Sequence, residues 1–587
     1  MTVSTLTVAP EANASGAAPA AEPDPLGLSL LARSSDLRRQ AIARAIRDDF
    51  PDWLENVKGA ATCTSPIRLA GTMTTVEAAT GRLLSSVDTA TMPDGVLYKP
   101  CGNRRETVCP SCSKVYQRDA YEVVRTGLLG GKGVPERVSQ HPAIFTTHTA
   151  PSFGEVHTRR VPNGRHTCAD RKRCDCRPDP CHARRDNPRC EHGRPLACFA
   201  RHDKTDRMLG TPLCLDCYDH DHQVVWNIFS GELWRRTKQA ADRYLGHLAD
   251  ARGIPRIPKT VGEDRITWIP PVRIGHGKVA ELQARAAVHF HSVLRLDGID
   301  PDDLDAIVPP PAGFTVDDLH DAMRYATMHT RFRTRSHPDR PGGWVIAWGE
   351  QYEPRTIALA GDGSISDSVV AGYLAKYATK STEATGHLSG RLTPETVDVY
   401  ADPDGDHIQR LIDACWRLGR PTSRQTRTVP AGRTAKPVRR AGARWTCPDC
   451  DGTTRLNSCP RCTPLAATPD RPRPTSTARK AANRFTLLRR WAHMLGYGGH
   501  FLTKSSRYSI TFRFIRDQRI TFRRNESTGP SRDGAVAEQP TVLVVNFLQF
   551  VGAGWQTPAD AMLATTSAAL AREHQDAARQ HYAALNN

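Results

Sequence analysis

Two histidines separated by one residue, His289 and His291, are the first candidates for chemistry. In residues 288–296 the apolar positions alternate with them, as in a strand that buries one face. Both imidazoles should therefore leave the strand on the same side, where two neutral ring nitrogens can bind one divalent ion. Alone, such a pair is more typical of two solvated histidines, so this interpretation depends on a second motif.

That second motif is a segment rich in tyrosine and lysine. Tyr373 and Tyr377 are four residues apart, as are Lys376 and Lys380, so on a helix over roughly 367–379 each pair shares a face. A phenol is a weak nucleophile near neutral pH because its pKa is about 10. Nearby ammonium groups and a metal on a phosphate would help it attack. Two core tyrosines with solvated lysines explain this segment alone equally well, but the two motifs together favour phosphoryl-transfer chemistry.

A compact cysteine unit lies at 446–465. Two Cys-x-x-Cys pairs separated by eight residues have the spacing of a zinc ribbon with four thiolates: Cys447, Cys450, Cys459 and Cys462. Four thiolates leave no coordination position for water, so we expect structural Zn²⁺. Basic linkers on both sides indicate that the ribbon grips DNA or a partner.

Five more cysteines are candidate zinc ligands: Cys101, Cys109, Cys112, Cys214 and Cys217. The last four form two Cys-x-x-Cys pairs that could share one site around an insert at 160–220. That insert is crowded with Cys, His and Arg and short of large apolar residues, so we expect metal–ligand bonds to hold it together. Six cysteines between 168 and 198 could form a further site, and the sequence leaves their pairing open.

The composition points to a polyanionic partner. The 587 residues include 80 Lys and Arg against 62 Asp and Glu, a formal net charge of +18, and nucleic acid is the obvious candidate. The first 27 residues lack a basic start and an apolar run, so we expect a disordered leader rather than a secretory signal. No run of 18 apolar residues occurs, so we expect a cytoplasmic protein that spans no membrane, with cysteines that bind metal.

Taken together, these motifs carry a resemblance. His-hydrophobic-His followed by Tyr-x-x-x-Tyr-x-x-Lys resembles the HUH endonucleases, specifically the two-tyrosine initiators of rolling-circle plasmids and isometric single-stranded DNA phages. Four further stretches resemble initiators of actinobacterial plasmids and integrative conjugative elements: CGNRRETVCPSC (101–112), TAPSFG (149–154), PLCLDC (212–217) and WAHMLGY (491–497). The resemblance covers roughly residues 60–515.

The resemblance implies an α+β fold, with an HUH core built on a central antiparallel sheet, plus the cysteine-rich insert and the zinc ribbon. It implies that His289 and His291 hold Mg²⁺ or Mn²⁺ at the scissile phosphate of a single-stranded or cruciform DNA origin. One tyrosine then forms a 5′-phosphotyrosine, and the free 3′-OH primes a host polymerase. We expect Tyr377 to act first, because it stands three residues before Lys380 as in single-tyrosine relatives, and Tyr373 to act at termination.

Lys376 and Lys380 would position the phosphate or screen its developing charge. The family's third metal ligand is not evident in the sequence, and Glu281 and Asp297 are the candidates. In FTTHT (145–149), His148 stands where the family has leucine, and we expect it to face the core. GLLGGKG (127–133) lacks the first glycine and the closing Ser or Thr of a phosphate loop, so unwinding is expected to need a separate host helicase.

The expected organisation follows from these motifs and from composition. It comprises a leader and helix at 1–50, a cysteine-containing region at 51–140, the endonuclease domain with its insert at 141–400, a basic linker at 401–445, the ribbon, and a basic α/β region with a helical tail at 480–587. A conjugative relaxase is the enzymatic alternative, although relaxases usually place the tyrosine before the histidines. A non-enzymatic zinc-containing DNA-binding regulator would leave the Tyr-Lys helix unexplained.

Overall fold

The computed structural model describes residues 28–77, 79–161, 176–262, 265–357, 367–379, 390–421, 445–446, 453–454, 484–528 and 542–585. The chain forms two compact units, which we call the terminal unit (residues 1–114 and 530–587) and the central unit (residues 115–529). None of the helices in the described ranges is long and apolar enough to cross a membrane.

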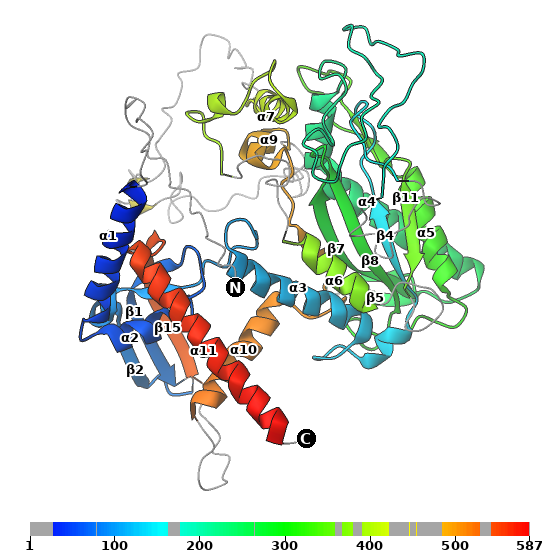
Figure 1. Ribbon diagram of the computed structural model, residues 1–587. Coiled ribbons are helices and arrows are strands. Elements are labelled where there is room, and N and C mark those ends of the chain that lie inside the picture. Colours follow the sequence, from blue (N-terminus) through cyan, green and yellow to red (C-terminus); the bar gives the residue numbers. More distant parts are fainter. Residues whose placement is uncertain are drawn as a thin grey trace. The chain divides into compact units, whose positions relative to one another are not determined.

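The sheet of the terminal unit joins strands from both ends of the sequence (Figure 1). Strand β1 (Ile67–Glu77) pairs antiparallel with β15 (Val542–Ala553) along its whole length and with β2 (Leu83–Asp88) and β3 (Leu97–Lys99) on its other side. Gly71 of β1 has a φ of +134°, and a Cβ there would lie 2.1 Å from the carbonyl oxygen of Phe547. The close approach of β1 and β15 therefore requires glycine at this position.

Helices from both ends of the chain cover this unit: α1 (Leu28–Ala45), α2 (Phe50–Val57) and α11 (Pro558–Leu585). Arg44 is buried and forms ion pairs at 2.9 Å with Asp94 and with Asp560, so one guanidinium ties α1 to α11. Trp53 and Tyr98 are fully buried in the core beneath α2. The burial of a paired charge and two large aromatics fixes the fold of the unit around β1.

A five-stranded antiparallel sheet forms the centre of the central unit, in the order β11 (Tyr352–Thr356), β4 (Ala143–His148), β8 (Val288–Gly298), β7 (Val272–Leu282) and β14 (Leu502–Lys504). All four strand pairs are antiparallel. Along β8, the fully buried Phe290, Leu294 and Leu296 share one face, and Val293 packs in a second cluster on the other. The expected antiparallel sheet is therefore confirmed.

Helices pack on both faces of this sheet (Figure 1). On the face of Phe290 lie α4 (His220–Ala251), α5 (Val316–His329), α7 (His407–Leu418) and α9 (Thr486–Arg490). On the face of Val293 lie α3 (Pro110–Leu129), which begins in the terminal unit, and α6 (Asp367–Tyr377). Side-chain caps start three of the helices: Asp219 for α4, Thr315 for α5 and Asp406 for α7.

The remaining elements are shorter. Three two-stranded pairs are β5 (Ile257–Val261) with β6 (Arg265–Ile269), β9 (Arg331–Arg333) with β10 (Val345–Ala347), and β12 (Trp445–Thr446) with β13 (Thr453–Thr454). Helix α10 spans Phe512–Thr528, and short 3-10 helices are η1 (Thr89–Thr91), η2 (Pro93–Gly95), η3 (Glu136–Gln140), η7 (Val397–Val399) and η8 (Ala492–Met494).

Candidate functional site

His289 and His291 lie near the start of β8 and leave the sheet on the face that α6 covers. Their ring centroids are 4.5 Å apart, with the rings close to perpendicular. His289 stands opposite Glu281 of β7, and His291 stands between Val279 of β7 and Thr147 of β4. The alternation that predicted a common side for the two imidazoles is therefore present in the structure.

His291 is the centre of the contacts at this site. Its Nδ1 lies 3.2 Å from the hydroxyl of Thr147. Its Nε2 lies 3.2 Å from Oε2 of Glu281 and 3.4 Å from the hydroxyl of Tyr373. An imidazole nitrogen, a carboxylate oxygen and a phenol oxygen therefore converge on one point, and the first two are donors that suit a divalent cation.

His289 lies beside this point and its Nδ1 is 3.4 Å from Nε2 of Gln283, which can donate to it. Burial, followed by the positive potentials of His291 and Arg285, lowers the pKa of His289 to about 3. The imidazole is thus neutral at physiological pH, which is the form that binds metal. Among the described residues, His289, His291 and Glu281 are not one of the groups whose ligand atoms all lie within 4.8 Å of one another.

Of the two candidate third ligands, the structure brings Glu281 to the histidines and holds Asp297 elsewhere. The Asp297 carboxylate accepts hydrogen bonds from Arg295 at 2.6 and 2.9 Å and lies 2.7 Å from Nδ1 of His141. Arg295 and Asp297 are completely buried. The interpretation of Asp297 as a metal ligand is therefore wrong, because its oxygens belong to a buried ion pair that holds the sheet to its neighbours.

Tyr373 reaches the site from α6, whose buried face packs on the sheet through Val370, Ala371, Leu374 and Ala375. The Tyr373 ring stands nearly perpendicular to that of His291, with centroids 5.0 Å apart, and its edge meets Phe145 of β4. These contacts fix the direction of the phenol, and its oxygen is placed beside Nε2 of His291.

The other residues predicted on this helix are described only in part. Helix α6 begins at Asp367, as expected, and ends at Tyr377, whose side chain lies outside the described residues. Lys376 is exposed in the last turn. Lys380 also lies outside the described residues, so its predicted role stays a prediction.

His148 faces the core, as expected from the sequence. It is fully buried among Trp234, Trp348 and Tyr352, and its Nε2 lies 3.0 Å from the hydroxyl of Thr327. Burial lowers its pKa to about 3, so the ring is neutral. His148 pairs with Phe290 of β8, so its side chain lies on the Phe290 face of the sheet, opposite His291 and the candidate site.

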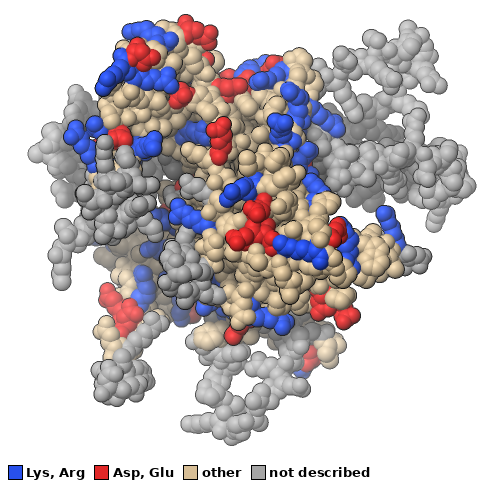
Figure 2. Space-filling view, turned by 90° about the vertical axis from the view of Figure 1, so that its right-hand side faces the viewer, with Lys and Arg blue, Asp and Glu red and all other residues tan. Residues whose placement is uncertain are grey.

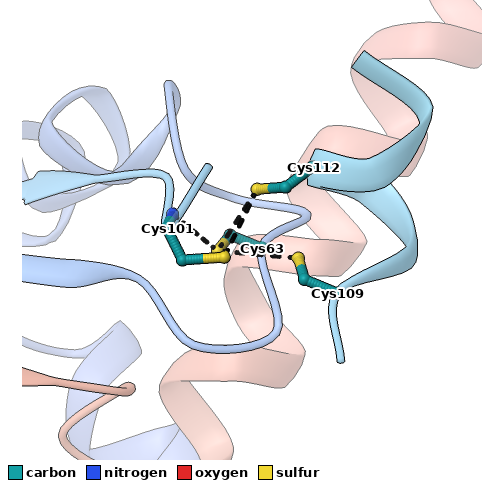
Figure 3. Close-up of side chains that lie close together, drawn as sticks. All are labelled: Cys63, Cys101, Cys109 and Cys112. Carbon is teal, nitrogen blue, oxygen red and sulfur yellow. Dashed lines mark hydrogen bonds between the residues drawn. The ribbon is translucent and has the colours of Figure 1, made fainter. Parts of the chain in front are cut away.

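Three groups of four cysteine or histidine residues in the described part of the chain could each hold a metal ion. The first lies in the terminal unit and joins Cys101, Cys109 and Cys112 to Cys63 (Figure 3). Sulfur atoms are 3.8 Å apart for Cys63–Cys109 and Cys63–Cys112 and 3.6 Å apart for Cys101–Cys112. Zinc–sulfur bonds of about 2.3 Å set tetrahedral edges of about 3.8 Å, so the spacing fits Zn²⁺.

The backbone around this first group is arranged to support thiolates. Burial alone would raise the pKa of Cys109, but N–H groups of Cys112 and Thr64 outweigh it and lower that pKa to about 7. Cys101 likewise donates its N–H to Cys63 Sγ at 3.3 Å. Cys63 was not predicted, because no second cysteine near it in the sequence marks it as a ligand.

The second group lies in the insert of the central unit and joins Cys214 and Cys217 to Cys190 and His192. Nδ1 of His192 is 3.2 Å from Sγ of Cys217 and 3.9 Å from Sγ of Cys214. The suggestion that Cys109, Cys112, Cys214 and Cys217 share a site is therefore wrong, because each pair completes its tetrad with residues of its own unit.

The four ribbon cysteines, Cys447, Cys450, Cys459 and Cys462, lie outside the described residues. Strands β12 and β13, which flank the first pair in sequence, do form an antiparallel pair, with Trp445 opposite Thr454. The ribbon itself stays a prediction.

Comparison with known proteins identifies the family of this chain. Residues 49–447 and 450–569 match the family described as "Replication initiator protein, pSAM2". The chain is 32% identical over 551 residues to a replication initiator protein of Streptomyces ambofaciens, covering 93% of this chain and 95% of the relative. No solved structure matches the chain. The chain therefore belongs to the pSAM2 family of replication initiator proteins.

Proposed function

We propose that this replication initiator cuts one DNA strand with a tyrosine and so starts rolling-circle replication from an origin of a plasmid or integrative element. One observation carries the proposal: the hydroxyl of Tyr373 lies 3.4 Å from Nε2 of His291, beside the Glu281 carboxylate. A nucleophile next to an imidazole–carboxylate pair is what in-line attack on a phosphodiester requires.

The reaction forms one phosphoester bond and breaks another. The phenol loses its proton and its oxygen attacks phosphorus, while the bond from phosphorus to the 3′ oxygen breaks and that oxygen takes up a proton. The products are a 5′-phosphotyrosine and a free 3′-OH. Because one phosphoester replaces another, the strand can later be rejoined. The 3′-OH would prime a host polymerase, and unwinding would fall to a host helicase.

His289, His291 and Glu281 are the residues that would hold the divalent ion. Their donor set is two imidazoles, which bind first-row divalent ions, and one carboxylate, which is a usual ligand of Mg²⁺ and Mn²⁺. Such an ion would polarise a non-bridging phosphate oxygen and offset its charge in the transition state. The lowered pKa of His289 favours the neutral imidazole, the form whose lone-pair nitrogen can bind a metal.

The contact of Tyr373 with His291 favours Tyr373 as the first nucleophile, which reverses the order expected from sequence. Tyr377 lies one helical turn further along α6, as a second tyrosine for the regenerated origin should. Lys376 is exposed in the same turn, where its ammonium group can meet a phosphate. Lys380 would act similarly.

A basic hollow on the opposite side of the sheet offers a place for a second DNA segment. It has a volume of about 850 Å³ between α4 and α5 and is lined by Arg243, His247, Tyr244, Tyr325 and Arg331, among others. The two tyrosine rings lie 5.3 Å apart. Cations beside aromatic rings are typical of single-strand binding surfaces. Figure 2 shows lysine and arginine spread widely over the face it displays, with acidic side chains between them.

Cleavage of a labelled single-stranded origin oligonucleotide tests the proposal. Wild-type protein with Mg²⁺ or Mn²⁺ should form a protease-sensitive covalent adduct. Tyr373→Phe should lose most of that adduct, Tyr377→Phe should cut once but fail to terminate, and the double variant should be inert. Phenylalanine keeps the packing against Phe145 and removes only the nucleophile.

Tyr400→Phe is the matched control, because this tyrosine follows η7 and packs against the core cluster on the Phe290 face, across the sheet from His291. It should keep the full yield of adduct. An adduct on the double tyrosine variant would place the nucleophile elsewhere. Tight DNA binding without any adduct in the wild-type protein would instead support a regulator that does not cut.

A further inference from the structure

We propose that the central unit contains a further zinc centre, formed by Cys181, Cys198 and His202 of the insert and by His157, which precedes it. Their ligand atoms all lie within 4.8 Å of one another, and all four side chains are buried or half-buried. Cys198 and His202 are four residues apart in the sequence, and the fold brings His157 and Cys181 to them.

The spacing of the ligand atoms fits a tetrahedral ion. Sγ of Cys198 is 3.6 Å from Nε2 of His202, and Sγ of Cys181 is 3.8 Å from Nδ1 of His157. The two ring nitrogens are 3.1 Å apart. Zinc bonds of about 2.3 Å to sulfur and about 2.0–2.1 Å to nitrogen set edges of about 3.6 Å between sulfur and nitrogen and about 3.4 Å between nitrogens.

A carboxylate outside the group orients one of its histidines. Oδ2 of Asp206 lies 2.6 Å from Nδ1 of His202, so Nδ1 carries the proton and Nε2 presents its lone pair to the cluster. The N–H of Thr158 points at Sγ of Cys181, at 3.1 Å, which favours the thiolate. These are the outer contacts that zinc ligands usually make, and they come from residues that would bind no metal themselves.

In the described part of the insert, 176–220, two of the large apolar side chains, Phe199 and Met208, are 60% and 47% exposed. A loop region without an apolar core needs cross-links, and metal–ligand bonds can supply the folding free energy. Together with the group of Cys190, His192, Cys214 and Cys217, the proposed centre would give this insert two metal staples.

The zinc centre also stands next to the candidate active site. Gly210 packs so tightly on the turn between β7 and β8 that a Cβ there would lie 2.3 Å from the backbone of Ala284. A cavity of about 830 Å³ is lined by His157 and Thr158 together with Gln283 and Arg285 of that turn. Since Gln283 contacts His289, the ion would fix one wall of the cavity beside the histidine pair, a consequence that rests on the proposed function.

Metal analysis of the full-length protein, purified under reducing conditions and weighed intact by native mass spectrometry, tests the centre without DNA. His202→Ala and Cys198→Ser should each bind one zinc fewer than wild type. His182→Ala is the matched control: its ring contacts Cys181 and Glu155, but it is not in the group, so its zinc count should be unchanged. His202→Cys should restore the lost zinc, because cysteine is also a zinc ligand.

Asp206→Asn keeps all four ligands and should weaken zinc binding at one centre about 10- to 100-fold, seen as faster release to a chelator. Wild-type zinc counts in folded His202→Ala and Cys198→Ser would overturn the proposal, as would loss of a zinc in His182→Ala. If His202→Ala is insoluble, His202→Cys and Asp206→Asn still decide the matter. Tyr373→Phe should keep the wild-type zinc count, so failure of the cleavage proposal would not imply failure of this one.

Discussion

Oε2 of Glu281 lies 3.2 Å from Nε2 of His291, across the pair of strands β7 and β8. If both residues hold the divalent ion, then Glu281→Gln should raise the Mg²⁺ or Mn²⁺ concentration needed for half-maximal cleavage by an order of magnitude or more. Affinity for duplex DNA should change little, because it depends on distributed basic residues. A metal titration of adduct yield measures the effect.

Exposed Glu136→Gln is the control for the removed charge and should titrate like wild type. His291→Ala and His289→Ala should abolish cleavage at any metal concentration while duplex binding persists. Equal loss of cleavage and DNA binding in these variants would show that the histidines support the fold rather than the reaction.

The cysteine group of the terminal unit predicts a linked loss of metal and stability. Cys63→Ser leaves three thiolates and should remove about one zinc and lower the melting temperature of this unit. The indole N–H of Trp555 donates to the carbonyl oxygen of Cys63 at 3.0 Å, so tryptophan fluorescence should report the change. The control is Cys415→Ser, which changes a buried cysteine outside the three groups. This variant should bind as much zinc as the wild-type protein. An unchanged zinc count in Cys63→Ser would contradict the assignment.

The burial of the Lys278 ammonium group predicts that the stability of the protein depends on pH. Lys278 is buried on the face of Phe290, with its ammonium 3.6 Å from that ring centroid, and burial lowers its pKa from 10.5 to about 7. Between these pH values the unfolded chain binds more protons than the folded one, so stability attributable to this group rises with pH. Below pH 7 the cost of burying the charge is fully present.

Lys278→Met should therefore melt a few degrees higher than wild type near pH 6. The difference should shrink as the pH rises towards 10, where the unfolded lysine also loses its proton. Melting curves of both proteins across this range measure it. A difference that stays constant with pH would show that Lys278 is not the titrating group.

The basic hollow between α4 and α5 predicts how DNA affinity responds to salt. Arg243→Ala and Arg331→Ala should each weaken binding of single-stranded DNA and lower the slope of log affinity against log salt by about 0.7 for each phosphate that the variant no longer neutralises. Arg39→Ala, which removes an exposed arginine of α1 paired with Asp36, should leave the slope unchanged. Identical slopes for all three variants would exclude the hollow as a DNA surface.

The sequence predicted the parts of the structure that depend on local periodicity. The alternation around His289 and His291 indicated the right strand and the right face, and the segment at Asp367 indicated the right helix start. The tail from Pro558 is helical, as expected. Strong local patterns of this kind survive folding because tertiary contacts reinforce them.

Long-range partners could not be predicted in the same way. Cys63 and His157 have no local motif that marks them as ligands, and their partners lie far along the chain or on other loops. The carboxylates Glu281 and Asp297 were equally plausible by type, and only their register and the position of Arg295 separate them. The pairing of β1 with β15 was likewise not evident, because nothing in either segment specifies its partner.

That pairing has a consequence for biosynthesis. Residues 67–77 emerge from the ribosome early, but their main hydrogen-bonding partner, residues 542–553, is made near the end of the chain. At about 5–20 residues per second the nascent strand waits on the order of tens of seconds. During that time an unpaired edge is exposed to other chains, so the nascent initiator is open to aggregation until its last strand has been made.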